Sequence, residues 1–192
     1  MTFTRSLHNY EPVDSEDQIR LARFEDAEAV GEIARTAFKV DRFHADPMID
    51  PKRADELHYQ WGKNSVLGIA ADAVIVAVDD HDQPIGFVTC KLNHGTFETL
   101  GRFIGTIVLV ATSDAARGNG FGRRMTAQAL NWFLQSGCDI VEVGTQATNK
   151  PAAGLYEASG FQVSDHSVSL RKWLGTATSV VETETESAKI LL

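Results

Sequence analysis

The chain has 192 residues, of which 43% are hydrophobic and 23% charged, a composition typical of one globular domain with a buried core. Its formal net charge is −8, which argues against nucleic acid as a partner because phosphate binding needs a basic surface. No apolar run approaches the roughly 20 residues that cross a bilayer, and the N-terminal residues lack an apolar signal core, so we expect a cytoplasmic protein without a membrane partner.

The spacing of apolar residues predicts one α/β domain over residues 18–174. Polar composition predicts flexible segments at 1–17 and 175–192. In chain order, the pattern first predicts a short strand within 18–26 that runs into a helix, a loop at 40–51 and a helix at 52–65. It then predicts a hairpin of strands 73–78 and 85–92, a loop at 93–102 and a strand at 103–111. The last predicted elements are a helix at 123–137, a strand at 139–146, a short helix at 150–160, and strand, turn, strand over 161–174.

The chain contains two cysteines, Cys90 and Cys138, and both lie in apolar segments. Their positions have no spacing typical of a metal site or a disulfide framework. We therefore predict two buried thiols, with a disulfide or a metal ligand as the alternative.

A glycine-rich stretch, RGNGFG at 117–122, joins a predicted strand to a predicted helix. It does not match the dinucleotide-binding fingerprint, since the third glycine comes one residue early, and it lacks the lysine of a Walker loop. A tight turn alone would explain alternate glycines. However, the loop opens a helix, whose free amides attract anions, and Arg117 stands at its entrance. Alternate glycines also let successive backbone amides converge on one pyrophosphate.

The second informative stretch is TQATNKPAAGLYEASGF at 145–161. Asn149 and Tyr156 are seven positions apart, almost two helical turns, so they are expected on the same side of the short helix. Taken singly, Asn149 fits a helix cap and Tyr156 fits a packing residue. Their place one strand away from the glycine-rich loop favours a shared site.

The segment ARGNGFGRRM after an apolar strand resembles the acetyl-CoA pyrophosphate loop of the GNAT N-acetyltransferases, whose signature Arg/Gln-x-x-Gly-x-Gly/Ala corresponds to Arg117, Gly120 and Gly122. The resemblance extends over residues 18–174. It implies the GNAT fold, a mixed and mostly antiparallel sheet flanked by helices, with strands 103–111 and 139–146 splayed apart. Thr112 and Asp114 depart from the valine and proline that the family often has there.

The resemblance implies acetyl-CoA as cosubstrate and no metal. It implies that Asn149 hydrogen-bonds the pantetheine arm and that Tyr156 faces the thioester sulfur as the catalytic acid. A free backbone N–H near Val110 and Ala111 would stabilise the oxyanion. The full set of implied cofactor-binding residues is Val110, Ala111, Thr112, Arg117, Gly118, Asn119, Gly120, Phe121, Gly122, Asn149 and Tyr156.

A tyrosine suits this chemistry because acyl transfer expels a thiolate. A phenol of pKa about 10 is protonated at neutral pH and can protonate a thiolate whose conjugate acid has a pKa of about 8.5. The attacking amine must be neutral. The sequence does not single out a general base: His44, His94, Glu98 and an ordered water chain all remain open.

Residues 41–49 and 58–66, with ALNWF at 129–133, are similar to the TDP-fucosamine acetyltransferase group of the GNAT family. This implies an acceptor of the class dTDP-4-amino-4,6-dideoxyhexose, acetylated on its 4-amino group. Arg42, His44 and Trp61 are then candidates for contacts to phosphate, sugar or base, although a structured turn would also explain the first segment.

Two other functions remain open at this point. A peptide amine, polyamine or antibiotic acceptor would suit the acidic charge, and the chain could be a non-catalytic CoA-binding module. Homodimers are common in this architecture, so a homodimer is an open alternative, but no interface pattern in the sequence indicates one.

Overall fold

The computed structural model describes residues 1–14, 17–39, 41–168 and 170. The strands are β1 (Thr2–Ser6), β2 (Ile19–Leu21), β3 (Ala73–Val78), β4 (Pro84–Asn93), β5 (Ile104–Thr112), β6 (Ile140–Gly144) and β7 (Gln162–Asp165). The helices are α1 (Ala27–Ala37), α2 (Pro51–Val66), α3 (Gly95–Leu100), α4 (Phe121–Gln135) and α5 (Lys150–Ala158), with short 3₁₀ turns at Phe24–Asp26 and Asp114–Ala116.

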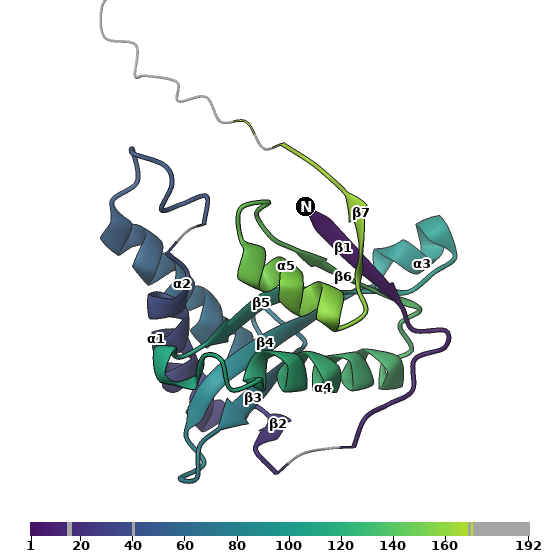
Figure 1. Cartoon of the computed structure of the whole chain (residues 1–192), viewed down its shortest axis with the longest axis horizontal. Coiled ribbons are helices and arrows are strands. Elements are labelled where there is room, and N and C mark those ends of the chain that lie inside the picture. Colours follow the sequence, from purple (N-terminus) through teal and green to yellow (C-terminus); the bar gives the residue numbers. More distant parts are fainter. Residues whose placement is uncertain (15–16, 40, 169, 171–192) are drawn as a thin grey trace, which may run out of the picture.

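The seven strands form one sheet in the order β2-β3-β4-β5-β6-β1-β7. Strands β5 and β6 run parallel, and the other neighbouring pairs are antiparallel. Helices α4 and α5 lie together across the near side of this sheet (Figure 1). The α/β fold with a mixed, mostly antiparallel sheet is therefore confirmed.

Alternate side chains of β3 enter two separate hydrophobic clusters, as expected for a strand that is buried on both faces. Ile75 and Ala77 belong to the cluster that α4 and α5 cover, whereas Val74, Val76 and Val78 belong to the cluster that α1 covers. The sheet thus lies between two helical layers, and the two layers bring different functional side chains to it.

The prediction of a flexible N-terminal segment is wrong for Thr2–Ser6, which form strand β1 between β6 and β7 (Figure 1). Phe3 pairs with Val143 on one side and with Val163 on the other, and its side chain is 0% exposed. The segment has a single strongly apolar residue among polar ones, and its partners lie near the other end of the domain. A short strand of this kind gives no local periodicity.

The chain after β1 is also attached, because it runs along helix α4. The Asn131 Oδ1 accepts hydrogen bonds from the Tyr10 hydroxyl (3.0 Å) and from the Val13 N–H (3.1 Å), and its Nδ2 donates to the Val13 carbonyl (2.7 Å). One buried amide therefore fixes much of the stretch between β1 and β2.

Most other elements agree with their predicted ranges within about two residues, a normal uncertainty for helix and strand ends. The exception is the predicted loop at 93–102, which contains helix α3. The second strand predicted within 161–174 is not seen at 166–168, and the rest of it, like the tail at 175–192, lies mostly outside the described residues. No described helix is long and apolar enough to cross a membrane.

Cys90 and Cys138 are free and buried, as predicted. Burial raises the pKa of both thiols, that of Cys138 to about 11. Both sulfurs are therefore protonated and unreactive at neutral pH.

Candidate active site

Strands β5 and β6 separate halfway along β5. Their pairing runs from Ile104–Ile140 to Ile107–Val143 and then stops, while β5 continues to Thr112 beside β4. The final residues of β5 therefore have no β6 partner on that edge. The splayed pair that the sequence analysis expects is present, and it leaves backbone groups of β5 available to an extended ligand.

A β-bulge in β5 lies at the point where the strands part. Val88 and Cys90 of β4 are opposite Val110 and Ile107 of β5, so β5 has one residue more than its partner across this interval. A bulge re-aims backbone groups and side chains locally. The buried Thr89 hydroxyl accepts a hydrogen bond from the Leu109 N–H at 2.9 Å, which holds the bulge in place.

The glycine-rich loop follows β5 and is exposed from Arg117 to Gly120. Gly118 and Gly120 have φ angles of 79° and 78°, and a Cβ atom at either position would meet no atom within 4 Å. Space is therefore available at both positions, and what requires glycine there is the left-handed backbone. That conformation turns the chain from β5 into α4.

Helix α4 begins directly after this loop, with Gly120 as an N-cap that offers no side-chain hydrogen bond. The amides of Phe121, Gly122 and Arg123 consequently lack intrahelical acceptors. Together with the positive end of the helix dipole, such amides are suited to bind an anion. The Arg117 guanidinium lies beside it and pairs with Asp114 at 2.9 Å across an exposed surface.

Helix α5 packs against the start of α4, since a Cβ atom at Gly122 would lie 3.4 Å from Leu155. Next to Leu155 stands Tyr156, which is 4% exposed and packs against Phe3 and Phe161 at ring-centroid distances of 5.7 and 6.0 Å. Burial raises the pKa of Tyr156 to about 12. Its phenol is therefore protonated throughout the physiological pH range.

The hydroxyl of Tyr156 is free to take a ligand. No residue that the structure describes forms a hydrogen bond with this hydroxyl. Ser159 Oγ is a fully buried polar side-chain atom without a partner, and the Tyr156 hydroxyl is not such an atom. The ring lies in the core, and the hydroxyl has no protein partner among the described residues. This is the arrangement expected of a proton donor at the edge of a binding site.

Asn149 caps helix α5, because its Oδ1 accepts a hydrogen bond from the Ala152 N–H at 3.3 Å. The structure therefore shows the helix cap directly. The side-chain NH₂ group of this half-exposed residue remains for a ligand. In the chain, the start of α4 follows β5, and the Asn149 cap follows β6.

The predicted acceptor residues lie at the α1–α2 end of the molecule. Arg42 is exposed and its guanidinium stacks over Phe43 at 4.8 Å. His44 has both ring nitrogens occupied: Nδ1 faces Asp41 Oδ2 at 2.6 Å and Nε2 faces Asp55 Oδ1 at 2.9 Å. Burial alone would lower the pKa of His44, but the two carboxylates raise that pKa above its ordinary value.

Sequence reasoning missed His58, which connects these residues. It is 3% exposed, and its ring stacks on Phe38 at 4.9 Å, on His44 at 5.8 Å and on Trp61 at 6.4 Å. A lone histidine in a helix gives no signal by itself. Its repeat with Trp61, three positions later on one helix face, could have pointed to it.

Close packing of α1 and α2 holds this cluster together. A Cβ atom on Gly62 would lie 2.9 Å from the Cβ of Ala34, and one on Gly31 would lie 2.7 Å from the Tyr59 ring. Small residues are therefore required where the two helices touch. They keep the histidine-bearing face of α2 at a fixed distance from α1.

Two of the general-base candidates lie elsewhere. His94 and Glu98 belong to or border helix α3, and His94 stacks on Phe103 just before β5 begins. Because β5 points toward the glycine-rich loop, this is the opposite end of the strand. The described geometry does not place either side chain near Tyr156.

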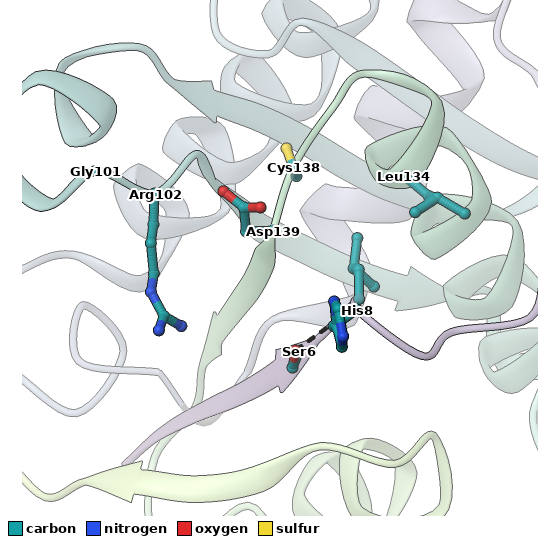
Figure 2. Close-up of a pocket in the computed structure, with 8 residues that line it drawn as sticks. Ser6, His8, Gly101, Arg102, Leu134, Cys138 and Asp139 are labelled. Carbon is teal, nitrogen blue, oxygen red and sulfur yellow. Dashed lines mark hydrogen bonds between the residues drawn. The ribbon is translucent and has the colours of Figure 1, made fainter.

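A pocket of about 480 Å³ also opens at that opposite end (Figure 2). It is lined by Ser6, Leu7, His8, Gly101, Arg102, Leu134, Cys138 and Asp139. These residues lie at the end of β1 and just after it, in the last turn of α4, and just before β5 and β6. The pocket is thus distinct from the site at the start of α4.

The sequence matches the model of the Acetyltransferase (GNAT) family over residues 27–161. The chain belongs to this family. The match includes the parted strands, the glycine-rich loop and helix α5, so the site described above lies within the family domain.

Individual relatives are similar in sequence to parts of this chain. Mycothiol acetyltransferase of Corynebacterium kroppenstedtii is 33% identical over 41% of this chain and 22% of its own length. The spore coat polysaccharide biosynthesis protein SpsD of Bacillus subtilis is 28% identical over 71% of this chain and 44% of its own length. The chain thus spans less than half the length of these curated relatives.

Solved structures share the fold. An aminoglycoside N-acetyltransferase AAC(6')-Iy in complex with CoA superposes with a TM-score of 0.60 at 17% identity, over 85% of this chain and 99% of that one. A protein described as a transcriptional regulator from Bacillus halodurans superposes with a TM-score of 0.59 at 22% identity, over 80% and 97%. At these identities the likeness concerns the fold.

Proposed function

We propose that this chain transfers the acetyl group of acetyl-CoA to a primary amine, the 4-amino group of a dTDP-linked 4-amino-4,6-dideoxyhexose. The observation that carries the proposal is the separation of β5 from β6 beyond Ile107 and Val143. A free helix start follows β5, and helix α5, which bears the buried phenol of Tyr156, packs against that helix start. Membership of the GNAT family supports acetyl-CoA as the donor.

In this proposal the pyrophosphate of CoA binds the amides at the start of α4, flanked by Arg117. The Asn149 side chain contacts the pantetheine arm, which lies along the free edge of β5. A backbone N–H near Val110 or Ala111 stabilises the oxyanion that forms when a neutral amine attacks the thioester carbonyl. The remaining loop residues, including Asn119, shape the backbone and need not supply side-chain contacts.

The carbon–sulfur bond then breaks, and the leaving sulfur takes a hydrogen bond and finally a proton from Tyr156. The phenol pKa of about 12 lies roughly 3 to 4 units above that of an ordinary thiol. Full transfer is therefore uphill in water, and Tyr156 acts chiefly by donating a hydrogen bond as charge builds on sulfur. The attacking nitrogen loses one proton as the amide forms, and this proton replaces the one that Tyr156 gives to the sulfur, so the phenol is regenerated. Acid assistance of this kind typically contributes ~10²–10⁴-fold.

The acceptor part of the proposal rests on the α1–α2 end. Arg42 presents an exposed guanidinium, which suits a diphosphate, and Trp61 is half-buried with an indole that suits stacking. The His44 ring lies between the carboxylates of Asp41 and Asp55 and so holds the loop in place. Its contribution to acceptor binding is therefore to position the loop and to present the edge of its ring. The relation to SpsD, a polysaccharide biosynthesis protein, favours a sugar-linked amine.

A cationic acceptor is the second candidate, favoured by the net charge of −8. A peptide N-terminus, a polyamine or an aminoglycoside would be drawn to an acidic surface. N-alpha-acetyltransferase 30 of Saccharomyces cerevisiae is 30% identical over 41% of this chain, a relative that acts on protein by its name.

A thiol-release assay decides between the two. Acetyl-CoA is incubated with the full chain and with each of four amines: a dTDP-4-amino-4,6-dideoxyhexose, spermidine, an aminoglycoside and a short peptide. We expect the highest kcat/KM with the nucleotide sugar. Turnover confined to a cationic amine would establish the second candidate and overturn the first. If no amine is acetylated and acetyl-CoA does not stabilise the fold, the chain is not an acetyltransferase of this kind.

A further inference from the structure

We propose that Asp41, His44 and His58 form a binding site for one divalent transition-metal ion, with Zn²⁺ as the ion that the donor set fits best. The site lies between the loop after α1 and helix α2, apart from the gap between β5 and β6. It shares His44 with the proposed acceptor end, but it does not depend on which amine is the acceptor.

The three ligand atoms converge on one point. Asp41 Oδ2 lies 2.6 Å from His44 Nδ1 and 3.7 Å from His58 Nε2, and one ligand atom from each residue lies within 4.8 Å of the others. Atoms bound to a tetrahedral Zn²⁺ at 2.0–2.2 Å are roughly 3.3–3.6 Å apart. The observed distances bracket this value, so small side-chain rotations bring the three atoms onto one ion.

The outer hydrogen bonds orient both histidines for metal binding. His44 Nε2 faces Asp55 Oδ1 at 2.9 Å, and His58 Nδ1 faces the Ala54 carbonyl oxygen at 2.8 Å. Metal-bound histidines typically donate their second N–H to a carboxylate or a backbone carbonyl, and this fixes the tautomer. Both acceptors come from adjacent residues of one helix, which leaves the opposite nitrogens directed at Asp41.

The carboxylate of Asp41 is divided between two tasks. Its Oδ1 accepts hydrogen bonds from the Phe43 N–H (2.6 Å) and the His44 N–H (3.3 Å) and so shapes the loop. Its Oδ2 faces the imidazoles. A side chain that is fixed by backbone hydrogen bonds holds its second oxygen in place, as a preorganised ligand requires.

The surroundings exclude most water without closing the site. The side chains of Asp41, His44 and His58 are 11%, 10% and 3% exposed. Stacking on Phe38 and Trp61 fixes the plane of the His58 ring. Three protein ligands leave the fourth tetrahedral position for water or for an oxygen of a bound molecule. The ion takes the place of the proton between His44 Nδ1 and Asp41, and that proton passes to solvent.

The test is a Zn²⁺ titration of the tag-free, chelator-stripped full chain in competition with a chromophoric chelator. We expect one Zn²⁺ per chain. Replacing Asp55→Asn should weaken binding by the roughly 10- to 100-fold typical of an outer hydrogen-bond partner. Asp41→Asn and His44→Gln should weaken it further. His81→Gln, an exposed histidine in the β3–β4 turn, should bind Zn²⁺ like the wild type.

A second measurement does not depend on variants that fold. Titration of the wild-type chain with Co²⁺ should give the intense visible bands of a four-coordinate ion, saturating at one equivalent and lost on addition of Zn²⁺. Sub-stoichiometric Zn²⁺ binding, six-coordinate Co²⁺ only, or equal losses in His44→Gln and His81→Gln would each overturn the proposal.

Discussion

The two sites proposed for this molecule are built from different kinds of groups. At the start of α4, the site consists of backbone: exposed glycines with left-handed φ angles, free helix amides and an unpaired strand edge. At the α1–α2 end, the cluster of Asp41, His44 and His58 consists of side chains, packed and mutually bonded. The first end tolerates exchange of most side chains, and the second depends on each one.

This difference has a physical reason. A pyrophosphate is recognised by converging N–H groups, which any residue supplies provided that the chain can turn. A compact charged cluster is stable only when its groups satisfy one another, since an unpaired buried charge is costly. Substitutions at the two ends should therefore fail in different ways, by loss of ligand binding or turnover at the first and by loss of stability at the second.

Tyr156→Phe should produce the largest effect, because Tyr156 is the one side chain at the backbone-built end to which we assign chemistry. We expect kcat to fall by ~10²–10⁴-fold with an unchanged Kd for CoA, measured by thiol release and by calorimetry. Tyr10→Phe is the matched control, because it also removes one tyrosine hydroxyl, but one that is hydrogen-bonded to Asn131 of helix α4. Equal turnover in wild type and Tyr156→Phe would remove Tyr156 as the acid.

Asp41→Ala in the chelator-treated protein should mainly affect stability. It removes charged hydrogen bonds to His44 and to two backbone amides, so the free energy of unfolding should fall by about 3 kcal/mol in urea titration. Asn119→Ala at the other end should change it by less than about 0.5 kcal/mol. Asp80→Ala, exposed in the β3–β4 turn, controls for loss of one negative charge. Similar values for the three variants would contradict the contrast between the ends.

Gly120→Val should weaken CoA binding by roughly 5- to 150-fold, because a branched residue at φ 78° costs about 1–3 kcal/mol and rearranges the amides. Gly137 ends α4 with φ 82° and equally open space. Gly137→Val should therefore cost similar stability and leave the CoA affinity unchanged. Calorimetric titration of both variants separates strain from ligand contact, and an equal loss of affinity would place the phosphate site elsewhere.

The smallest expected effect is on alkaline stability. The pKa of Tyr156 is about 12 in the folded chain and about 10 when unfolded. Between these values the folded state binds more protons, so stability is complete below pH 10 and falls as the pH rises toward 12. At pH 11 the loss should be about 1 kcal/mol relative to Tyr156→Phe. Parallel pH profiles of the two proteins would show that the phenol ionises freely.

The sequence is most informative where the signal is local. The turn from β5 into α4 needs positive φ at Gly118 and Gly120, and both glycines stand in the sequence at that junction. The hairpin of β3 and β4 is likewise predicted correctly, because its strands are apolar and separated by turn residues. The roles assigned to Asn149 and Tyr156 remain predictions; the structure shows Asn149 as the cap of α5 and Tyr156 packed against Phe3 and Phe161.

Features that depend on distant partners escape such reasoning. Phe3 becomes buried only because β6 and β7 close around it. The role of His58 depends on its contacts with Asp41, with the ring of Phe38 at the end of α1 and with the ring of Trp61 on α2. Helix α3 lies between two glycines and exposes Phe97 and Leu100, so its pattern is typical of a loop. No periodicity within one segment reports such contacts.

The position of β1 also constrains the order of assembly. Strand β1 precedes the other described strands in the chain, yet it lies between β6 and β7, the last two described strands. Until β6 and β7 have been synthesised, Phe3 lacks both of its strand partners, so we expect this apolar residue to remain exposed in earlier folding intermediates. Pairing between strands that are distant in the sequence is slow compared with helix formation. We therefore expect the complete sheet to form late in folding and in one cooperative step.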